Sequence, residues 1–164
     1  FAQSGSRVLL VDCDIRKGRQ HYIFGCHNQK GLSNLLLDNI RENYQEYIQE
    51  TKIKNLCVMF RGVTPPNPSE LLGSSKNKEL ISILKNNYDI IIFDSAPVNG
   101  GLTDSVIMST LVDGVVIVSS HKETPISLLN NTKKNLQNVN ANILGVVLNR
   151  ANSKSKKYYG HYYG

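Results

Sequence analysis

Five short runs of the chain are almost entirely apolar, and none of them alternates between apolar and polar positions. They are residues 8–12, 56–60, 89–94, 114–119 and 143–149, which are rich in Val, Ile and Leu. A strand that alternates has one face in water, whereas an unbroken apolar run is typical of a strand that is buried on both faces. The pattern therefore predicts five buried strands.

Between these runs, apolar residues recur with the period of a helix. The pattern predicts helices at residues 32–37, 44–48, 80–84, 103–111 and 126–136. Strands that alternate with helices are typical of a parallel sheet, because a parallel connection has to cross over the sheet. The predicted fold class is α/β, with a mostly parallel, doubly wound sheet.

The two ends of the chain differ from this middle. The first six residues, FAQSGS, read as the end of a helix that Gly5 closes, and the chain does not begin with Met, so we expect further sequence upstream of Phe1. From Asn152 onward, Ser, Lys, Gly and Tyr replace the aliphatic residues, and such a composition does not bury a core. We expect one domain over residues 1–151 and a flexible, tyrosine-rich tail over residues 152–164.

The composition narrows the class of protein. With 164 residues, 40% of them apolar and 20% charged, the chain fits one soluble domain, and no apolar run approaches the roughly 18 residues that span a bilayer. The three cysteines lack the paired spacing of a zinc or redox site, which predicts reduced thiols in the cytoplasm. The net charge of +6 would suit nucleic acid, but Arg150 and the lysines of residues 154–157 carry much of it, so we expect no nucleic-acid partner.

Two of the apolar runs end in aspartate. Asp12 ends the first, and Asp14 follows two residues later, so in an extended backbone both carboxylates point to the same side. Asp94 ends the run at 89–94, and the carboxyl ends of parallel strands form the ligand-binding edge of a doubly wound sheet. Three carboxylates at one crevice repel one another without a cation, and Mg²⁺ with bound phosphate suits such oxygen ligands. For each motif alone, the alternative is that the aspartates cap a helix or a turn.

The two acidic motifs belong to a longer series. The chain contains DCDIRKGRQHYIFG, KGLSNLLL, PPNPSELL, DSAPVNGGLTDSVI and LGVVLNR in that order, followed by a tyrosine-rich end. Over essentially the whole chain this series resembles the bacterial tyrosine kinases of the CpsD/CapB type, with Gly18, Ser95 and Ala96 as mild departures. The acidic pair alone also resembles partition and septum-site ATPases, which are the first alternative. An inactive, non-enzymatic scaffold is the second.

The resemblance implies a P-loop kinase of the deviant type that uses ATP and Mg²⁺. In that family pattern Asp12, Asp14 and Asp94 would be catalytic. Asp14 and Asp94 would hold the magnesium ion, and Asp12 would accept or orient the proton of the tyrosine phenol. Arg16 would contact phosphate or a neighbouring subunit, with a solvated side chain as the alternative. Asn149 would read the edge of the adenine ring, with an ordinary turn residue as the alternative.

No G-x-x-x-x-G-K-[ST] sequence occurs in the chain. In such a loop, backbone N–H groups hold the phosphates and the lysine neutralises their charge. The family that the chain resembles carries this loop upstream, after a first strand that lies centrally in the sheet. We therefore expect that the sequence in hand lacks that strand and the P-loop, and that the chain alone is inactive as an enzyme.

Four tyrosines, Tyr158, Tyr159, Tyr162 and Tyr163, lie among lysines and glycines at the end of the chain. One interpretation is an adhesive tail or a contact to single-stranded nucleic acid, since rings and lysines suit both. The resemblance implies instead a cluster that the kinase phosphorylates on itself. The tyrosines of the domain are predicted to be half-buried packing residues: Tyr22, Tyr44, Tyr47 and Tyr88.

The resemblance also implies the partners of the whole protein. It implies a ring-like homo-oligomer in which the tail of one subunit enters the site of the next. It further implies activation by a membrane adaptor of the polysaccharide co-polymerase type, and reversal by a cognate tyrosine phosphatase. The implied role is control of capsular or exopolysaccharide synthesis or export, in the cytoplasm at the inner face of the plasma membrane.

Overall fold

The computed structural model describes residues 1–98 and 103–151. Strand β1 (Val8–Asp12) lies inside a four-stranded sheet, parallel to β3 (Leu56–Met59) on one side and to β4 (Ile90–Asp94) on the other. A short strand, β2 (Gln49–Glu50), pairs antiparallel with β3, so that the order is β2-β3-β1-β4. The α/β class and the mostly parallel sheet are confirmed. The antiparallel edge strand was not predicted, because two residues carry no periodicity.

The remaining strands form a sheet of their own. Strands β5 (Val115–Ser120) and β6 (Ile143–Asn149) are a parallel pair, and within the described residues no hydrogen bonds join β5 to β4. The two sheets line an apolar cleft of about 1130 Å³, to which Ile92, Val116 and Val118 contribute. The predicted parallel strands are thus all present, and in the described residues they are divided between two sheets. Apolar runs identify strands, but they do not say which strands are neighbours.

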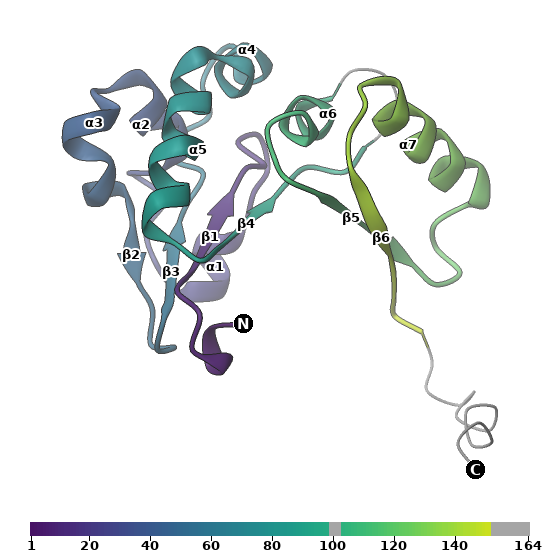
Figure 1. Ribbon diagram of the computed structural model, residues 1–164, viewed down its shortest axis with the longest axis horizontal. Coiled ribbons are helices and arrows are strands. Elements are labelled where there is room, and N and C mark those ends of the chain that lie inside the picture. The colour runs from purple at the N-terminus through teal and green to yellow at the C-terminus, as the bar shows by residue number, and fades with distance from the viewer. Residues whose placement is uncertain (99–102, 152–164) are drawn as a thin grey trace.

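The helices lie along the strands in the order that the sequence predicts (Figure 1). They are α1 (Gln20–Phe24), α2 (Leu32–Leu37), α3 (Ile40–Asn43), α4 (Pro68–Gly73), α5 (Ser75–Asn87), α6 (Asp104–Ser109) and α7 (Ile126–Asn138), with 3₁₀ turns η1 (Ala2–Ser4) and η2 (Tyr44–Tyr47). Figure 1 shows α2 to α5 gathered at β1 to β4, and α7 beside β5 and β6. The helix predicted at 44–48 is the 3₁₀ turn η2, which directly follows α3, and α1 was not predicted.

Local chemistry sets several of the helix ends. Gly5 has a left-handed backbone (φ 102°) and closes η1, as its position in the sequence predicts. Ser74 ends α4 and also begins α5, where its hydroxyl accepts a hydrogen bond from the N–H of Asn77 (3.2 Å). The chain therefore turns from α4 into α5 at a single residue. Within the described residues, no helix is long and apolar enough to cross a membrane.

The core lies between the four-stranded sheet and helices α2, α4 and α5. Its fully buried members include Leu9, Val11, Leu35, Leu36, Met59, Leu72, Leu80 and Leu84. Tyr47 is buried beside them and donates its hydroxyl to Asp38 (2.8 Å), while Tyr44 and Tyr88 are half-buried as predicted. Tyr22 is 74% exposed, so its predicted packing role is wrong. It lies on the outer side of α1, a helix too short to turn every apolar residue inward.

Two neighbouring leucines of α2 test the contribution of this core. Leu36 is 1% exposed and Leu37 is 65% exposed, although both belong to the same helix. We expect Leu36→Ala to lower the free energy of unfolding by about 2–5 kcal/mol, because it removes buried methyl groups and leaves a cavity. The matched control Leu37→Ala should cost less than about 0.5 kcal/mol. Urea denaturation followed by circular dichroism measures both, and equal losses would contradict the assignment of the core.

Candidate active site

The two acidic strand ends meet in the structure as the sequence predicts. Asp12 and Asp94 are the last residues of β1 and β4, and the parallel register places them directly beside each other. The strand pairing continues one residue further, because the N–H of Cys13 donates to the carbonyl of Asp94 (2.7 Å). The adjacency of these two carboxylates is therefore fixed by backbone hydrogen bonds and not by side-chain choice.

Asp12 is completely buried at this edge. Its Oδ2 accepts a hydrogen bond from the N–H of Gln20 (3.2 Å), whereas its Oδ1 is buried and has no partner among the described residues. Burial, and to a lesser degree repulsion by Asp94 and Asp14, raises the pKa of Asp12 to about 6, against the opposing effect of the Gln20 hydrogen bond. The Oδ1 atom of Asp12 therefore lacks the hydrogen bond or cation that buried carboxylates normally have.

Asp14 organises the turn that covers Asp12. Its Oδ1 accepts from the N–H of Lys17 (2.9 Å), and its carbonyl accepts from the N–H of Gly18 (2.7 Å). Gly18 then lies so close to Asp12 that a Cβ atom there would overlap the Asp12 carboxylate. Glycine at this position lets the turn of residues 14–18 lie directly on the buried aspartate.

Gln20 contacts both strand-end aspartates. In addition to its backbone bond to Asp12, its side-chain Nε2 donates to Oδ2 of Asp94 (2.5 Å). Asp94 itself is exposed, so one carboxylate of the pair faces solvent while the other does not. Sequence reasoning missed Gln20, because a glutamine that begins a short helix carries no distinctive signal.

The predicted magnesium ligands were tested against this geometry. Within residues 1–98 and 103–151, no three His, Cys, Asp or Glu side chains are placed to hold a metal ion together. Asp12, Asp14 and Asp94 are thus close enough to influence one another's charge, but they do not form a ready-made cage of three ligands. The unpartnered, buried oxygen of Asp12 and the oxygen-only donor set suit Mg²⁺, which usually takes its remaining ligands from water and phosphate.

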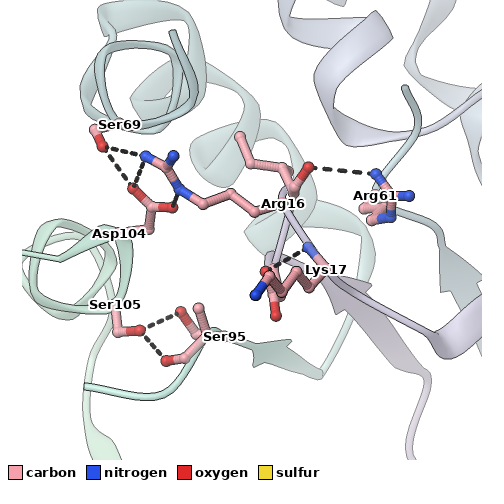
Figure 2. Close-up of polar contacts among 10 residues, drawn as sticks. Arg16, Lys17, Arg61, Ser69, Ser95, Asp104 and Ser105 are labelled. Carbon is pink, nitrogen blue, oxygen red and sulfur yellow. Dashed lines mark hydrogen bonds and ion pairs between the residues drawn. The ribbon is translucent and has the colours of Figure 1, made fainter. Parts of the chain in front are cut away.

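The side chain of Arg16 points toward Asp104 and Ser69 (Figure 2). Its Nε donates to Oδ2 of Asp104 (2.7 Å), and its Nη2 donates to the hydroxyl of Ser69 (3.0 Å). The Arg16 side chain is 49% exposed as well as paired, and its predicted contact with phosphate stays a prediction. Asp104 is the first residue of α6, which lies within the helix predicted at 103–111, but its pairing with Arg16 was not predicted.

Arg61 holds the covering turn from the other side. Its guanidinium donates to the carbonyls of Gly18 (3.1 Å) and Ile15 (3.3 Å), and also to the carbonyl of Gly62 (3.2 Å) and the hydroxyl of Thr64 (2.9 Å). Figure 2 shows this side chain facing the segment that carries Arg16 and Lys17. Five N–H donors in a rigid fork allow one arginine to join two loops in this way.

The remaining predicted residues lie elsewhere. Asn149 ends β6 in the two-stranded sheet, where its Oδ1 accepts from the N–H of Arg150 (2.8 Å), as a turn asparagine does. Its predicted contact with adenine stays a prediction. The predicted phosphorylation sites Tyr158, Tyr159, Tyr162 and Tyr163 lie outside the described residues, as does the predicted tail at 152–164. Cys13, Cys26 and Cys57 are free thiols, in agreement with the sequence.

The sequence and the fold of this chain are similar to those of known proteins. Residues 1–146 match the family model described as an AAA domain. The chain is 38% identical to the putative tyrosine-protein kinase CapB of Staphylococcus aureus, over 100% of this chain and 71% of that protein. It is 35% identical to the tyrosine-protein kinase YwqD of Bacillus subtilis (strain 168), over 99% of this chain and 67% of that protein.

A solved structure agrees with these relatives. The crystal structure of the chimerical protein CapA2B2 superimposes with a TM-score of 0.85 at 41% sequence identity, over 92% of this chain and 65% of that one. The chain thus spans about two thirds of the length of the proteins that it resembles. On the family model, the sequence identity and the shared fold, the chain belongs to the bacterial tyrosine-protein kinase family.

Proposed function

We propose that this chain is the larger part of the catalytic domain of an ATP-dependent protein-tyrosine kinase. The observation that carries the proposal is the pair of carboxylates at the ends of β1 and β4, one of which is buried with an unpartnered oxygen. Such a pair is unfavourable in an isolated fold, and it becomes favourable once a cation and a polyphosphate are bound beside it. The membership of the tyrosine-kinase family supports ATP as the nucleotide and tyrosine as the acceptor.

The three aspartates have different roles in this proposal. Asp14 and Asp94 are the more accessible carboxylates, and they hold Mg²⁺, whose charge neutralises the phosphates during transfer. Asp12 accepts or orients the proton of the tyrosine phenol. A pKa of about 6 suits a general base at neutral pH, because the carboxylate is mostly ionised but still basic. Because Asp12 is buried below Gly18, the phenol reaches it only if the turn of residues 14–18 moves.

The phosphates need a further binding element. The chain contains no G-K-[ST] sequence, and the cleft between β4 and β5 is lined by apolar strand residues, among them Ile92, Val116 and Val118. We propose that a parallel strand fills this cleft and joins the two sheets, followed by a phosphate-binding loop at the carboxyl ends of the strands. A version of the protein that includes this strand and loop is called the extended protein below.

The tail and the partners complete the proposal. Tyr158, Tyr159, Tyr162 and Tyr163 are the autophosphorylation sites, and each phosphate adds a charge of about −1.5 to −2 to a lysine-rich segment. The extended protein forms a ring-like homo-oligomer, responds to a membrane adaptor and a cognate phosphatase, and controls capsular or exopolysaccharide synthesis or export. The likeness to a chimerical CapA2B2 protein supports an adaptor, and the name of CapB supports the polysaccharide role.

The nucleotide site can be tested without any mutation. We expect the 164-residue chain to bind ATP·Mg²⁺ only weakly, because its carboxylates have no phosphate-binding loop beside them, and we expect the extended protein to bind it well. Isothermal titration calorimetry on both proteins measures the difference. A micromolar dissociation constant for the shorter chain, worth about −8 kcal/mol, would show that the nucleotide binds somewhere else.

The division of roles between the aspartates predicts two different phenotypes in the extended protein. Asp12→Asn should lower kcat for tyrosine phosphorylation by about 10²–10⁴, the usual contribution of general-base catalysis, and leave ATP affinity nearly unchanged. Asp94→Asn should weaken ATP·Mg²⁺ binding as well, because it removes charge that neutralises the phosphates before the reaction. Steady-state kinetics and nucleotide titration separate the two. Equal losses of binding and turnover in both variants would leave the aspartates as a single metal-organising cluster.

The acceptor tyrosines are tested by mapping phosphate on the extended protein. After incubation with ATP·Mg²⁺, mass spectrometry should find phosphotyrosine mainly at Tyr158, Tyr159, Tyr162 and Tyr163. Replacing all four by phenylalanine should remove most of the incorporated phosphate and leave ATP binding intact. Phosphate chiefly on Tyr44 or Tyr88 would contradict the tail assignment, and ATP hydrolysis without any phosphotyrosine would favour a partition-type ATPase.

A further inference from the structure

Helix α6 begins with two residues that contact both of the loops that follow the acidic strands. Asp104 forms an ion pair with Arg16, which lies in the loop after β1 (Figure 2). Ser105 forms hydrogen bonds with Ser95 and Ala96, which lie in the loop after β4. The first contact joins residues 88 positions apart in sequence, and the second closes the segment between β4 and α6. No helix-start chemistry requires them, because a helix can begin with an aspartate that faces only its own backbone.

The first contact pairs a buried carboxylate with a half-exposed arginine. Asp104 is 5% exposed, and its carboxylate accepts from Nε of Arg16 (2.7 Å) and from the hydroxyl of Ser69 on α4 (2.6 Å). Arg16 also donates to Ser69 (3.0 Å), so the three side chains close a small ring. Burial acts to raise the pKa of Asp104, but the hydrogen bonds from Arg16 and Ser69 outweigh it and hold the pKa below its usual value. The carboxylate therefore remains charged and paired.

The second contact is neutral and lies one residue further along. The hydroxyl of Ser105 donates to the carbonyl of Ala96, and it accepts from the hydroxyl of Ser95 (3.1 Å). Both residues directly follow Asp94, so the contact fixes the backbone immediately after the second acidic strand end. Because α6 also packs on α4, Asp104 and Ser105 are held by a rigid support.

We propose that Asp104 and Ser105 are positioning residues that fix the loops carrying Asp14 and Asp94 relative to each other. Two adjacent residues of one helical turn cannot move independently, so a shift of one loop is transmitted to the other. Ser69 completes the link by holding Arg16 and Asp104 together. The importance of this link for catalysis rests on the proposed kinase function, whereas the link itself is a property of the chain as it stands.

The experiment measures the motion of both loops in the full chain by hydrogen–deuterium exchange. The variants are Arg16→Met, Asp104→Asn, the double variant, Ser69→Ala and Ser105→Ala. Arg16→Met, Asp104→Asn, the double variant and Ser69→Ala should speed exchange at residues 14–18 by about tenfold or more, since each removes or weakens a hydrogen bond to a charged group. Ser105→Ala removes only neutral hydrogen bonds and should speed exchange there by a smaller factor, about two- to tenfold. Ser105→Ala should have this effect although its own contacts are at residues 95 and 96, and Asp104→Asn should likewise speed exchange at residues 95 and 96.

Thermal unfolding of the same variants separates positioning from general stabilisation. Arg16→Met leaves the buried Asp104 charge without its cation and should lower Tm, and the double variant should recover much of that loss because no unpaired charge remains. Exchange at residues 14–18 should stay fast in the double variant. The matched control is the exposed pair of Arg7 and Asp89 (2.7 Å), whose Asp89→Asn variant should leave exchange at both loops unchanged.

The inference is overturned if each substitution affects only its own loop, or if exchange in the double variant returns to the original rate together with Tm. If Arg16→Met does not fold, Ser69→Ala and Ser105→Ala still test the inference. They remove only neutral hydroxyl groups and leave no buried charge unpaired. In the extended protein, the double variant should lower kcat by more than it changes the KM for ATP. Absence of phosphotyrosine in the unsubstituted extended protein would instead refute the proposed function, and the exchange data would still decide the inference.

Discussion

The parallel register of β1 and β4 is the constraint on which the site depends. It places Asp12 and Asp94 side by side, with backbone hydrogen bonds on both sides of the pair. Two neighbouring carboxylates repel each other, and the surrounding residues limit that repulsion. Gln20 donates to both of them, and the turn of residues 14–18 removes one of them from water. Arg61 and Arg16 then hold that turn from two directions.

This arrangement lowers the free energy of unfolding at neutral pH. Burial raises the pKa of Asp12 from 3.8 to about 6, so below about pH 4 the carboxyl is neutral in both the folded and the unfolded chain and costs nothing. Between about pH 4 and pH 6 the unfolded chain ionises while the folded chain keeps the proton, so the penalty grows over this range and stays at about 3 kcal/mol at neutral pH. Perturbed carboxyl groups in crevices are common at functional sites, where stability is exchanged for reactivity.

Sequence reasoning identified the local features and missed the distant ones. The strands that contain Asp12 and Asp94 were placed correctly, because an unbroken apolar run is a local pattern that burial on both faces produces. Helix α1 and strand β2 were missed because they are too short to show a period. The pairing of Arg16 with Asp104 was also missed, since residues 88 positions apart meet only through the tertiary fold.

The distance along the chain between β1 and β4 has a consequence for how the protein is made. During synthesis β1 emerges early, but its neighbour β4 emerges only after α1 to α5 and two further strands. Until then Asp12 has only Asp14 as an acidic neighbour, and the repulsion by Asp94 arises in a later step that depends on a long-range contact. Non-local pairing of this kind forms slowly, because the entropy of closing a long loop has to be overcome first. The pair of carboxylates is thus completed only after more than half of the nascent chain has been made.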